Sequence, residues 1–102
     1  MNIPPTPITA ALVLSGGTAA TWTAIDISTA IPVNATWTWG ALSAYTSPNY
    51  SYLAPASDGK GQVAAIGGTV IPFFLPLITS QTLYYQADAG GSCSVTITGY
   101  LR

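Results

Sequence analysis

The chain has 102 residues, of which 49% are hydrophobic, 5% are charged and none is histidine. A soluble domain usually carries about 25% charged side chains, so this chain lacks most of the groups that acid–base or metal chemistry requires. Its formal net charge is −1, and its basic side chains, Lys60 and Arg102, are too few to hold a nucleic-acid backbone. We therefore expect one small domain that is neither an enzyme nor a nucleic-acid-binding protein.

Long stretches without charge raise the question of a membrane-spanning segment. Residues 1–25 and 27–57 contain no charged side chain, but Pro, Gly, Thr, Ser and Asn interrupt them too often for a spanning helix. The first seven residues contain three prolines and no basic side chain, unlike a signal peptide. We expect no membrane partner, and we interpret residues 1–7 as a proline-rich N-terminal arm ahead of a domain over residues 8–102.

The residue types along the chain favour β-structure throughout. Thr, Val, Ile, Trp and Tyr suit a pleated, half-buried surface, whereas glutamate is absent and other good helix formers are scarce. Glycine and proline recur at short intervals between the apolar runs. This pattern predicts an all-β fold, a single antiparallel β-sandwich that is jelly-roll-like, with about seven to eight short strands.

The first two predicted strands precede a compact turn. Residues 8–14 form an apolar run that stops at a Ser-Gly-Gly segment, and residues 19–25 form the second run. Residues 26–32 then predict a turn, in which Asp26 or Ser28 accepts hydrogen bonds from backbone N–H groups.

Residues 33–39 alternate strictly between apolar and polar side chains, which is the clearest strand pattern in the chain. The apolar positions are Val33, Ala35, Trp37 and Trp39, and the polar positions are Asn34, Thr36 and Thr38. We expect the tryptophans to pack in the core and the neutral polar face to meet neighbours at little desolvation cost. Residues 41–45 either continue this strand or form a separate edge.

The middle of the chain predicts a long loop region followed by short strands. Residues 46–61 contain two turn segments and form the main loop region. Residues 62–66 and 69–75 are the next apolar runs. Because proline cannot donate to a strand ladder, Pro72 predicts that the second of these is an edge strand or is bent.

The last two predicted strands are joined by a short glycine-containing segment. Residues 82–87 and 93–101 flank residues 88–92, which we interpret as a hairpin-like connection. In the final strand the apolar positions are expected on one face; they are Cys93, Val95, Ile97 and Leu101.

The few reactive side chains do not assemble into a predicted site. Cys93 lacks a neighbouring histidine or cation that would activate it, and its apolar strand position favours a buried structural thiol over a nucleophile. Asp26, Asp58 and Asp88 are better explained by turns than by acid–base pairing or calcium binding. We therefore predict no catalytic residue, no cofactor and no metal.

The remaining candidates for a functional role are aromatic residues. Tyr45, Asn49, Tyr50 and Tyr52 lie in or beside the main loop region, where exposed tyrosines can stack on sugars or contact proteins. We consider them a candidate ligand-contact loop, with simple anchoring of the loop as the alternative.

A second group of residues is a candidate for contacts between subunits. Phe73 and Phe74 are adjacent, so in a regular strand they face opposite sides and one of them points outward. We expect an outward aromatic to favour a subunit interface. The candidate oligomer or capsid interface comprises Phe73, Phe74, Tyr84 and the arm prolines Pro4, Pro5 and Pro7.

Two sequence segments in the chain resemble segments of small β-sandwich modules in tailed-bacteriophage virions. The first is Trp-Thr-Ala-Ile-Asp-Ile-Ser at residues 22–28, followed by Ile-Pro-Val-Asn-Ala-Thr at residues 31–36. The second is Leu-Tyr-Tyr-Gln at residues 83–86, a glycine-rich turn, and Ser-Val-Thr-Ile-Thr-Gly-Tyr at residues 94–100. The resemblance covers roughly residues 20–101, although the tryptophans at 37 and 39 are unusual for such modules and suggest a special contact there.

The resemblance implies a structural virion protein without catalytic residues. Such modules serve as capsid decoration proteins, head fibres, and tail-fibre or collar domains. The expected function is a decoration (cement) protein that forms a homo-oligomer, with a trimer favoured, on the viral capsid after assembly in the host cytoplasm. The implied partners are the major capsid protein or neighbouring fibre or tail subunits. The alternative is a tail, collar or head-fibre module that binds host-surface glycans through the tyrosine loop.

Overall fold

The computed structural model of the chain describes residues 5–102, so the predicted contact of Pro4 lies outside the described residues. Eight strands and no helix make up this part of the chain, which therefore contains no helix able to cross a membrane. The strands are β1 (Thr6–Gly17), β2 (Thr23–Asp26), β3 (Trp37–Ala44), β4 (Tyr50–Ala54), β5 (Val63–Ile66), β6 (Val70–Pro76), β7 (Thr82–Ala87) and β8 (Cys93–Leu101).

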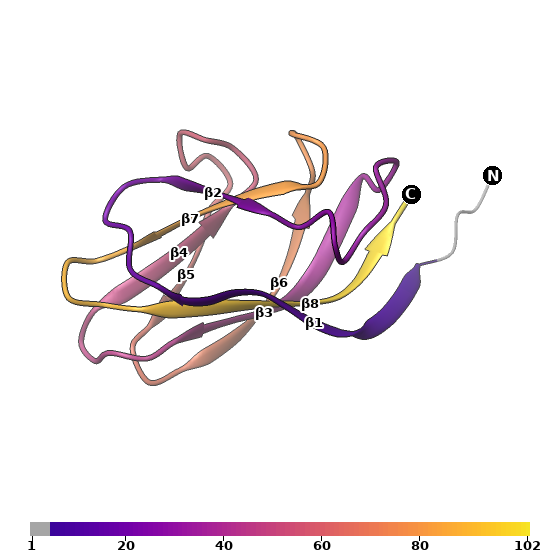
Figure 1. Ribbon diagram of the computed structural model, residues 1–102. Helices are drawn as coiled ribbons and strands as arrows, with labels where there is room; N and C mark the ends of the chain where they lie inside the picture. The colour runs from indigo at the N-terminus through magenta and orange to yellow at the C-terminus, as the bar shows by residue number, and fades with distance from the viewer. Residues whose placement is uncertain (1–4) are drawn as a thin grey trace.

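The strands form two antiparallel four-stranded sheets that pack face to face (Figure 1). The strand order is β1-β8-β3-β6 in the first, here called sheet A, and β2-β7-β4-β5 in the second, called sheet B. Both sheets combine strands from distant parts of the chain, as in an eight-stranded jelly roll. The prediction of an all-β, jelly-roll-like sandwich is confirmed.

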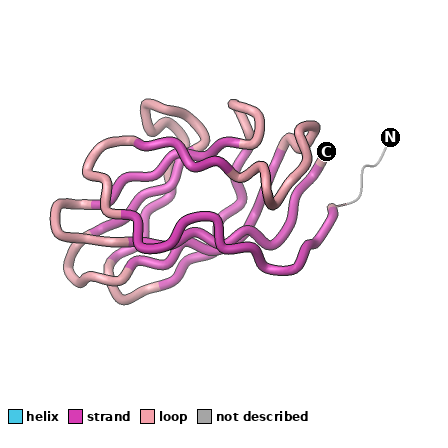
Figure 2. Tube along the Cα trace, in the orientation of Figure 1, coloured by secondary structure: helices cyan, strands magenta, loops and turns pink. Residues whose placement is uncertain are grey.

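The predicted hairpin between the last two strands is wrong. β7 pairs with β2 and β4 in sheet B, whereas β8 pairs with β1 and β3 in sheet A. The loop over residues 88–92 crosses from one sheet to the other (Figure 2) and is held by a 2.9 Å hydrogen bond from the Asp88 N–H to the Tyr50 carbonyl. Its glycines indicate that the chain turns, but they carry no information about which sheet receives the next strand.

All four sheet edges are short or irregular. β6 is an edge strand with Pro72 in its interior, as predicted, and β1 pairs with β8 through several register shifts. β2 and β5 contain four residues each. Thr6 and Pro7, which we assigned to the arm, already belong to β1 and pair with Tyr100 and Gly99 of β8.

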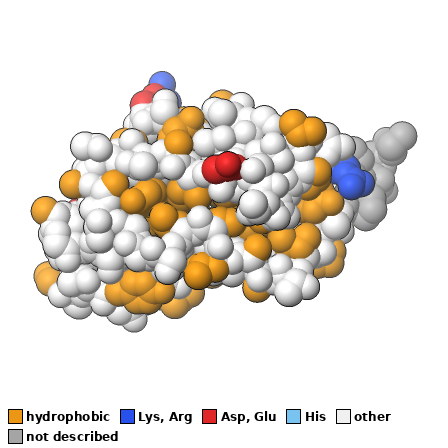
Figure 3. All heavy atoms as spheres, in the orientation of Figure 1, with side chains coloured by type: hydrophobic (Ala, Val, Ile, Leu, Met, Phe, Trp, Pro, Cys, Tyr) orange, Lys and Arg blue, Asp and Glu red, His pale blue; other side chains and the backbone are white. Residues whose placement is uncertain are grey.

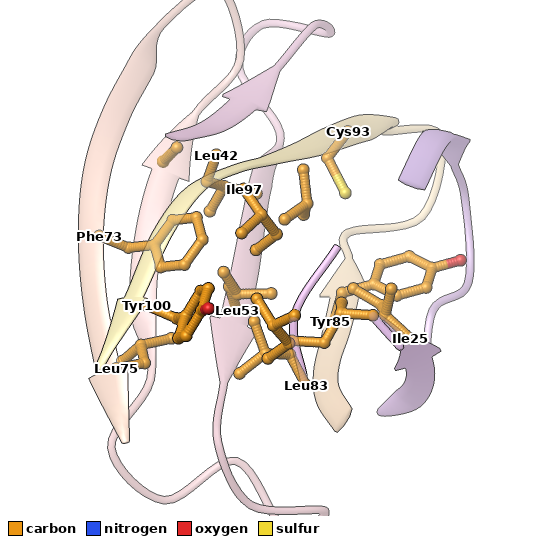
Figure 4. Packing of buried hydrophobic residues seen from close by; sticks show 14 of the residues in the cluster. Ile25, Leu42, Leu53, Phe73, Leu75, Leu83, Tyr85, Cys93, Ile97 and Tyr100 are labelled. Atoms are coloured by element: carbon orange, nitrogen blue, oxygen red, sulfur yellow. The ribbon is translucent and has the colours of Figure 1, made fainter. Parts of the chain in front are cut away.

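The hydrophobic core lies between the two sheets (Figure 4). Its largest aliphatic side chains have no exposed surface; they are Ile27, Leu42, Leu53, Leu83 and Ile97. Burying a side chain of this size stabilises the fold by about 1.5–3 kcal/mol relative to leaving it exposed. Cys93 is also fully buried, which confirms the prediction that its thiol lies in the core.

The predicted orientation of residues 33–39 is wrong. Residues 33–36 lie in a turn and the irregular segment after it rather than in a strand, and in β3 it is Thr38 that points into the core with no exposed surface. Its Oγ1 donates a 2.8 Å hydrogen bond to the Gly99 carbonyl, so the buried hydroxyl keeps a partner. Trp37 is 37% exposed and Trp39 is half-buried, because both lie on the outer face of sheet A. β3 then continues to Ala44 as a central strand rather than a separate edge.

A β-bulge reverses the side-chain alternation near the end of β8. Trp39 pairs with Gly99 and Gly40 pairs with Ile97, which leaves Thr98 as the extra residue. Beyond the bulge Tyr100 points into the core and is 7% exposed. The prediction that Leu101 shares the buried face is therefore wrong, and Leu101 is only half-buried.

Candidate interaction surfaces

The described residues enclose no pocket. Between residues 5 and 102 no pocket opens, and no three potential metal ligands lie together. Burial raises the pKa of the Cys93 thiol, against the smaller opposing effect of a hydrogen bond with Ser51. Figure 3 shows only isolated charged side chains on one side of the molecule.

Each aspartate side chain accepts a hydrogen bond from a backbone N–H, within a turn for Asp26 and Asp58 and from strand β4 for Asp88. Asp26 Oδ1 accepts a 2.9 Å hydrogen bond from the Ser28 N–H, as predicted for that turn. Hydrogen bonding with the Ser28 side chain, and secondly with its N–H, lowers the pKa of the exposed Asp26 carboxyl. Asp58 accepts from the Lys60 N–H at 3.1 Å and faces the Lys60 ammonium at 3.8 Å. Asp88 accepts from the Tyr50 N–H at 2.9 Å.

The outer face of sheet A carries a continuous aromatic stack. The rings of Trp37 and Phe74 lie 4.9 Å apart with planes 20° from parallel, and those of Trp39 and Phe74 lie 6.0 Å apart at 22°. Cross-strand pairing places Trp39 opposite Phe74 and Trp37 opposite Pro76. Phe74 is 54% exposed, so this stack, formed by Trp37, Phe74 and Trp39, is open to solvent.

Glycine makes room for the stack. A β-carbon on Gly99 would overlap the Trp39 indole, because the ring lies directly over that position of β8. A larger residue at 99 would lift Trp39 off the sheet. The bulge in β8 and the stack on β3 are thus parts of the same local arrangement.

The rest of the outer face of sheet A is apolar or neutral. Leu12, Thr96, Ala41 and Pro72 form one cross-strand row. None of the four strands of sheet A contains a charged residue. We call this surface, from Leu12 across to Pro72 and including the aromatic stack, the neutral face.

The outer face of sheet B carries a different row of aromatic rings. Tyr50 and Tyr52 project from β4 with centroids 6.3 Å apart and planes 16° from parallel. Trp22, which precedes β2, lies 6.4 Å from Tyr52 at an angle of 57° and rests on Gly59. Asp88 accompanies this row, since its Oδ1 accepts a 3.4 Å hydrogen bond from the Tyr52 hydroxyl.

The predicted tyrosine loop is divided between the two faces. Tyr50 and Tyr52 belong to strand β4 rather than to a loop, with Asn49 immediately before them. Tyr45 lies on the side of sheet A, where its hydroxyl donates a 2.9 Å hydrogen bond to Ser94 Oγ. Trp22 was not predicted as a contact residue, because the sequence shows no sign that its ring lies beside Tyr52.

The predicted interface residues also separate. Phe74 faces outward, but Phe73 is 4% exposed in the core, so the prediction that Phe73 contacts a neighbour is wrong. Tyr84 is half-buried on the outer side of sheet B, opposite Ala24 and Ala54. Pro5 and Pro7 are exposed at the start of β1.

No protein-family model matches the chain, and no curated protein shows significant sequence similarity to it. Functional inference therefore depends on the fold and on the chemistry of the two outer faces.

Proposed function

We propose that the chain is a structural subunit of a bacteriophage virion, a capsid decoration protein that oligomerises on the particle surface. The observation that carries the proposal is the neutral face, in which four strands without charge present the stack of Trp37, Phe74 and Trp39. Contiguous exposed apolar surface of this kind marks protein–protein contacts, and aromatic residues are enriched in their centres.

The dimensions of the neutral face suit an interface. Strands lie about 4.8 Å apart and rise about 3.3 Å per residue, so four strands along the length of β3 cover roughly 500 Å² in projection. A standard interface buries about 800 Å² of accessible surface per partner, and projecting side chains raise accessible area above the flat projection. The neutral face therefore supplies most of what a stable contact requires.

The sheet edges favour association through a face. Pro72 interrupts the ladder of β6, register shifts interrupt β1, and β2 and β5 are short. Such features disfavour the addition of a strand from another chain. A neighbour is thus accommodated on the neutral face rather than beside an edge.

The virion assignment combines the fold with the sequence resemblance. Jelly rolls with two sheets are frequent in viral capsid proteins, although they also occur in lectins and other proteins. The sequence segments at residues 22–28 and 94–100 also resemble segments of phage modules. In this proposal copies form a homo-oligomer, a trimer being favoured, that binds the major capsid protein or neighbouring fibre or tail subunits.

Sedimentation velocity of the purified chain tests the assembly. We expect an oligomer, and we expect Phe74→Asp to yield folded monomers because it places a charge between Trp37 and Trp39 in the aromatic stack of the neutral face. The matched control is Ile78→Asp, since Ile78 is 68% exposed but lies outside the strands. A monomeric unmodified chain at high micromolar concentration contradicts the proposal.

Labelling of purified particles tests the location. An antibody against the chain is expected to decorate the heads of intact virions in electron micrographs. Label confined to tails or collars would instead support the tail or collar form of the second candidate, a module that binds host-surface glycans. The aromatic row on sheet B favours that candidate, and the two roles are compatible because they use opposite faces.

A further inference from the structure

We propose that Trp22, Tyr52 and Tyr50 form a binding platform for the pyranose rings of a neutral saccharide, with Asp88 accepting hydrogen bonds from its hydroxyl groups. The platform lies on the outer face of sheet B and does not depend on assembly through sheet A. It deepens the second candidate function by naming the residues and the ligand class.

The rings of the platform extend across neighbouring strands. Tyr52 stands opposite Gln86 of β7 and Ala64 of β5, and Tyr50 stands opposite Ile66. Trp22 reaches Tyr52 from the β2 side. Tyr50 is 43% exposed while Tyr52 is half-buried, so the platform is accessible from solvent but held by its neighbours.

The structure holds each part of the platform in position. The Asp88 carboxylate accepts from the Tyr50 N–H at 2.9 Å through Oδ2 and from the Tyr52 hydroxyl at 3.4 Å through Oδ1. A carboxylate has about four acceptor sites, so both oxygens keep capacity for a ligand hydroxyl. On the other side, Gly59 leaves space for the Trp22 indole, which a β-carbon at that position would displace.

This combination of groups matches the two kinds of surface on a sugar ring. The face of an aromatic ring carries partial negative charge, which attracts the weakly positive C–H groups on the apolar side of a pyranose. The hydroxyl groups at the rim of the sugar need acceptors, and Asp88 provides one beside both tyrosines. The aromatic stack on sheet A lacks such a carboxylate, since its strands carry no charge.

Charge selects a neutral saccharide over an anionic one. Asp88 gives the platform a negative charge, and the nearby turn is neutral because Lys60 lies 3.8 Å from Asp58. The other basic side chain, Arg102, lies over Tyr100 at 5.7 Å. An acidic sugar would therefore meet a carboxylate without a compensating cation.

A quaternary ammonium group is the competing ligand, because aromatic rings with a carboxylate also attract cations. Such ligands are held in cages whose rings enclose them from several sides. Here the two tyrosine planes are 16° from parallel, and no pocket opens between residues 5 and 102. An open platform favours the flat face of a sugar.

Titration of the purified chain, followed by amide NMR spectra, tests the site. The probes are cellohexaose, maltohexaose, chitohexaose and a neutral galactan oligosaccharide, with tetramethylammonium chloride as the competing ligand. We expect at least one oligosaccharide to shift the amide signals of residues 50–52 and 86–88. Tyr50→Ala and Asp88→Asn should each weaken this binding about fivefold, which corresponds to about 1 kcal/mol.

The control variants separate the platform from folding and from assembly. Tyr45→Ala removes an exposed tyrosine on the side of sheet A and should leave saccharide binding unchanged. Tyr50→Phe keeps the ring and should retain most of the affinity. Phe74→Asp should abolish assembly but not binding, so loss of assembly alone does not count against the platform.

Three results would overturn the proposal. The first is the absence of amide shifts with all the oligosaccharides at millimolar concentration. The second is a response to tetramethylammonium alone, which would identify an ammonium site. The third is an equal loss of affinity in Tyr45→Ala and Tyr50→Ala, which would place the contact elsewhere.

Discussion

The two outer faces of this sandwich carry the same kind of side chain in different surroundings. Each carries a group of three neighbouring aromatic rings, Trp37, Phe74 and Trp39 on sheet A and Trp22, Tyr52 and Tyr50 on sheet B. On sheet A the rings are accompanied by proline, alanine and threonine, whereas on sheet B they are accompanied by a carboxylate that two of the tyrosines contact.

This difference shows that the polar groups beside an exposed aromatic ring determine which kind of partner or ligand the ring is suited to contact. Rings without hydrogen-bonding partners are best covered by another apolar surface, since covering them removes apolar area from water at little polar cost. Rings beside an acceptor suit a ligand that is apolar on one side and hydroxylated at its rim.

The strongest test of the neutral face is Gly99→Ala. The added β-carbon overlaps the Trp39 indole, and such overpacking costs about 1–3 kcal/mol of unfolding free energy. We also expect loss of the oligomer, because the displaced ring disrupts the aromatic stack. Urea denaturation and sedimentation velocity measure the two effects.

Gly16→Ala is the control for Gly99→Ala. Gly16 has a φ of 63°, and nothing lies within 4 Å of a β-carbon placed there. Alanine at this position costs about 1 kcal/mol through backbone strain alone and should leave the oligomer intact. Equal loss of assembly in both variants would show that it reflects stability rather than the aromatic stack.

Thr38→Val tests which side of β3 faces inward. The variant removes the hydroxyl that donates to the Gly99 carbonyl at 2.8 Å in the core, so the free energy of unfolding should fall by about 1 kcal/mol. Thr36→Val is the matched control, since Thr36 is exposed and its 3.4 Å contact with the Leu101 carbonyl is long. Chemical denaturation that ranks the two variants in the opposite order would contradict the described orientation of β3.

A pH titration should detect the polar surroundings of the sheet B row. Burial, and secondly the charge of Asp88, raise the pKa of the Tyr52 phenol above its ordinary value of 10.0. The protonated phenol therefore contributes stability that is complete below pH 10 and is lost as the pH rises through the folded pKa. Asp88→Asn should lower the pKa of Tyr52, as followed by phenolate absorbance, and an unchanged absorbance titration would exclude the coupling.

The smallest expected effect is that of salt on assembly. Because the neutral face contains no charged residue, raising sodium chloride to about 1 M, where the Debye length is about 3 Å, should not weaken the oligomer. Sedimentation velocity across a salt series measures this. Dissociation at high salt would indicate an ionic contact and would move the interface away from the neutral face.

The fold class could be predicted from the sequence because its signals are local. Glycine and proline mark where the chain turns, and Pro72 identifies an edge strand because its missing N–H cannot serve a central one. The pairing of strands is not local. The glycine-containing loop over residues 88–92 is equally compatible with a hairpin and with the crossing between sheets that the structure contains.

The outer surfaces were harder to predict, because the alternation of apolar and polar residues divides a strand into two faces without indicating which face is buried. The tryptophans at positions 37 and 39 suggest side chains that pack in the core. It is Thr38 that points inward, where its hydroxyl donates a hydrogen bond to a backbone carbonyl. The bulge at Thr98 shifts the alternation of β8 and cannot be read from residue types. Tyr50 and Tyr52 were recognised as candidates, but their neighbours Trp22 and Asp88 come from distant segments.

The pairing of β1 with β8 has a consequence for how the protein is made. These strands lie side by side (Figure 1), although nearly the whole described chain separates them in sequence. Sheet A cannot be completed until residues 93–101 have left the ribosome, and folds dominated by such distant pairings form slowly. During that interval the tryptophans of β3 and the apolar runs around them remain exposed, with almost no charge to keep nascent chains apart. In the proposed function, rapid capture by partner subunits would therefore protect the newly made chain as well as build the particle.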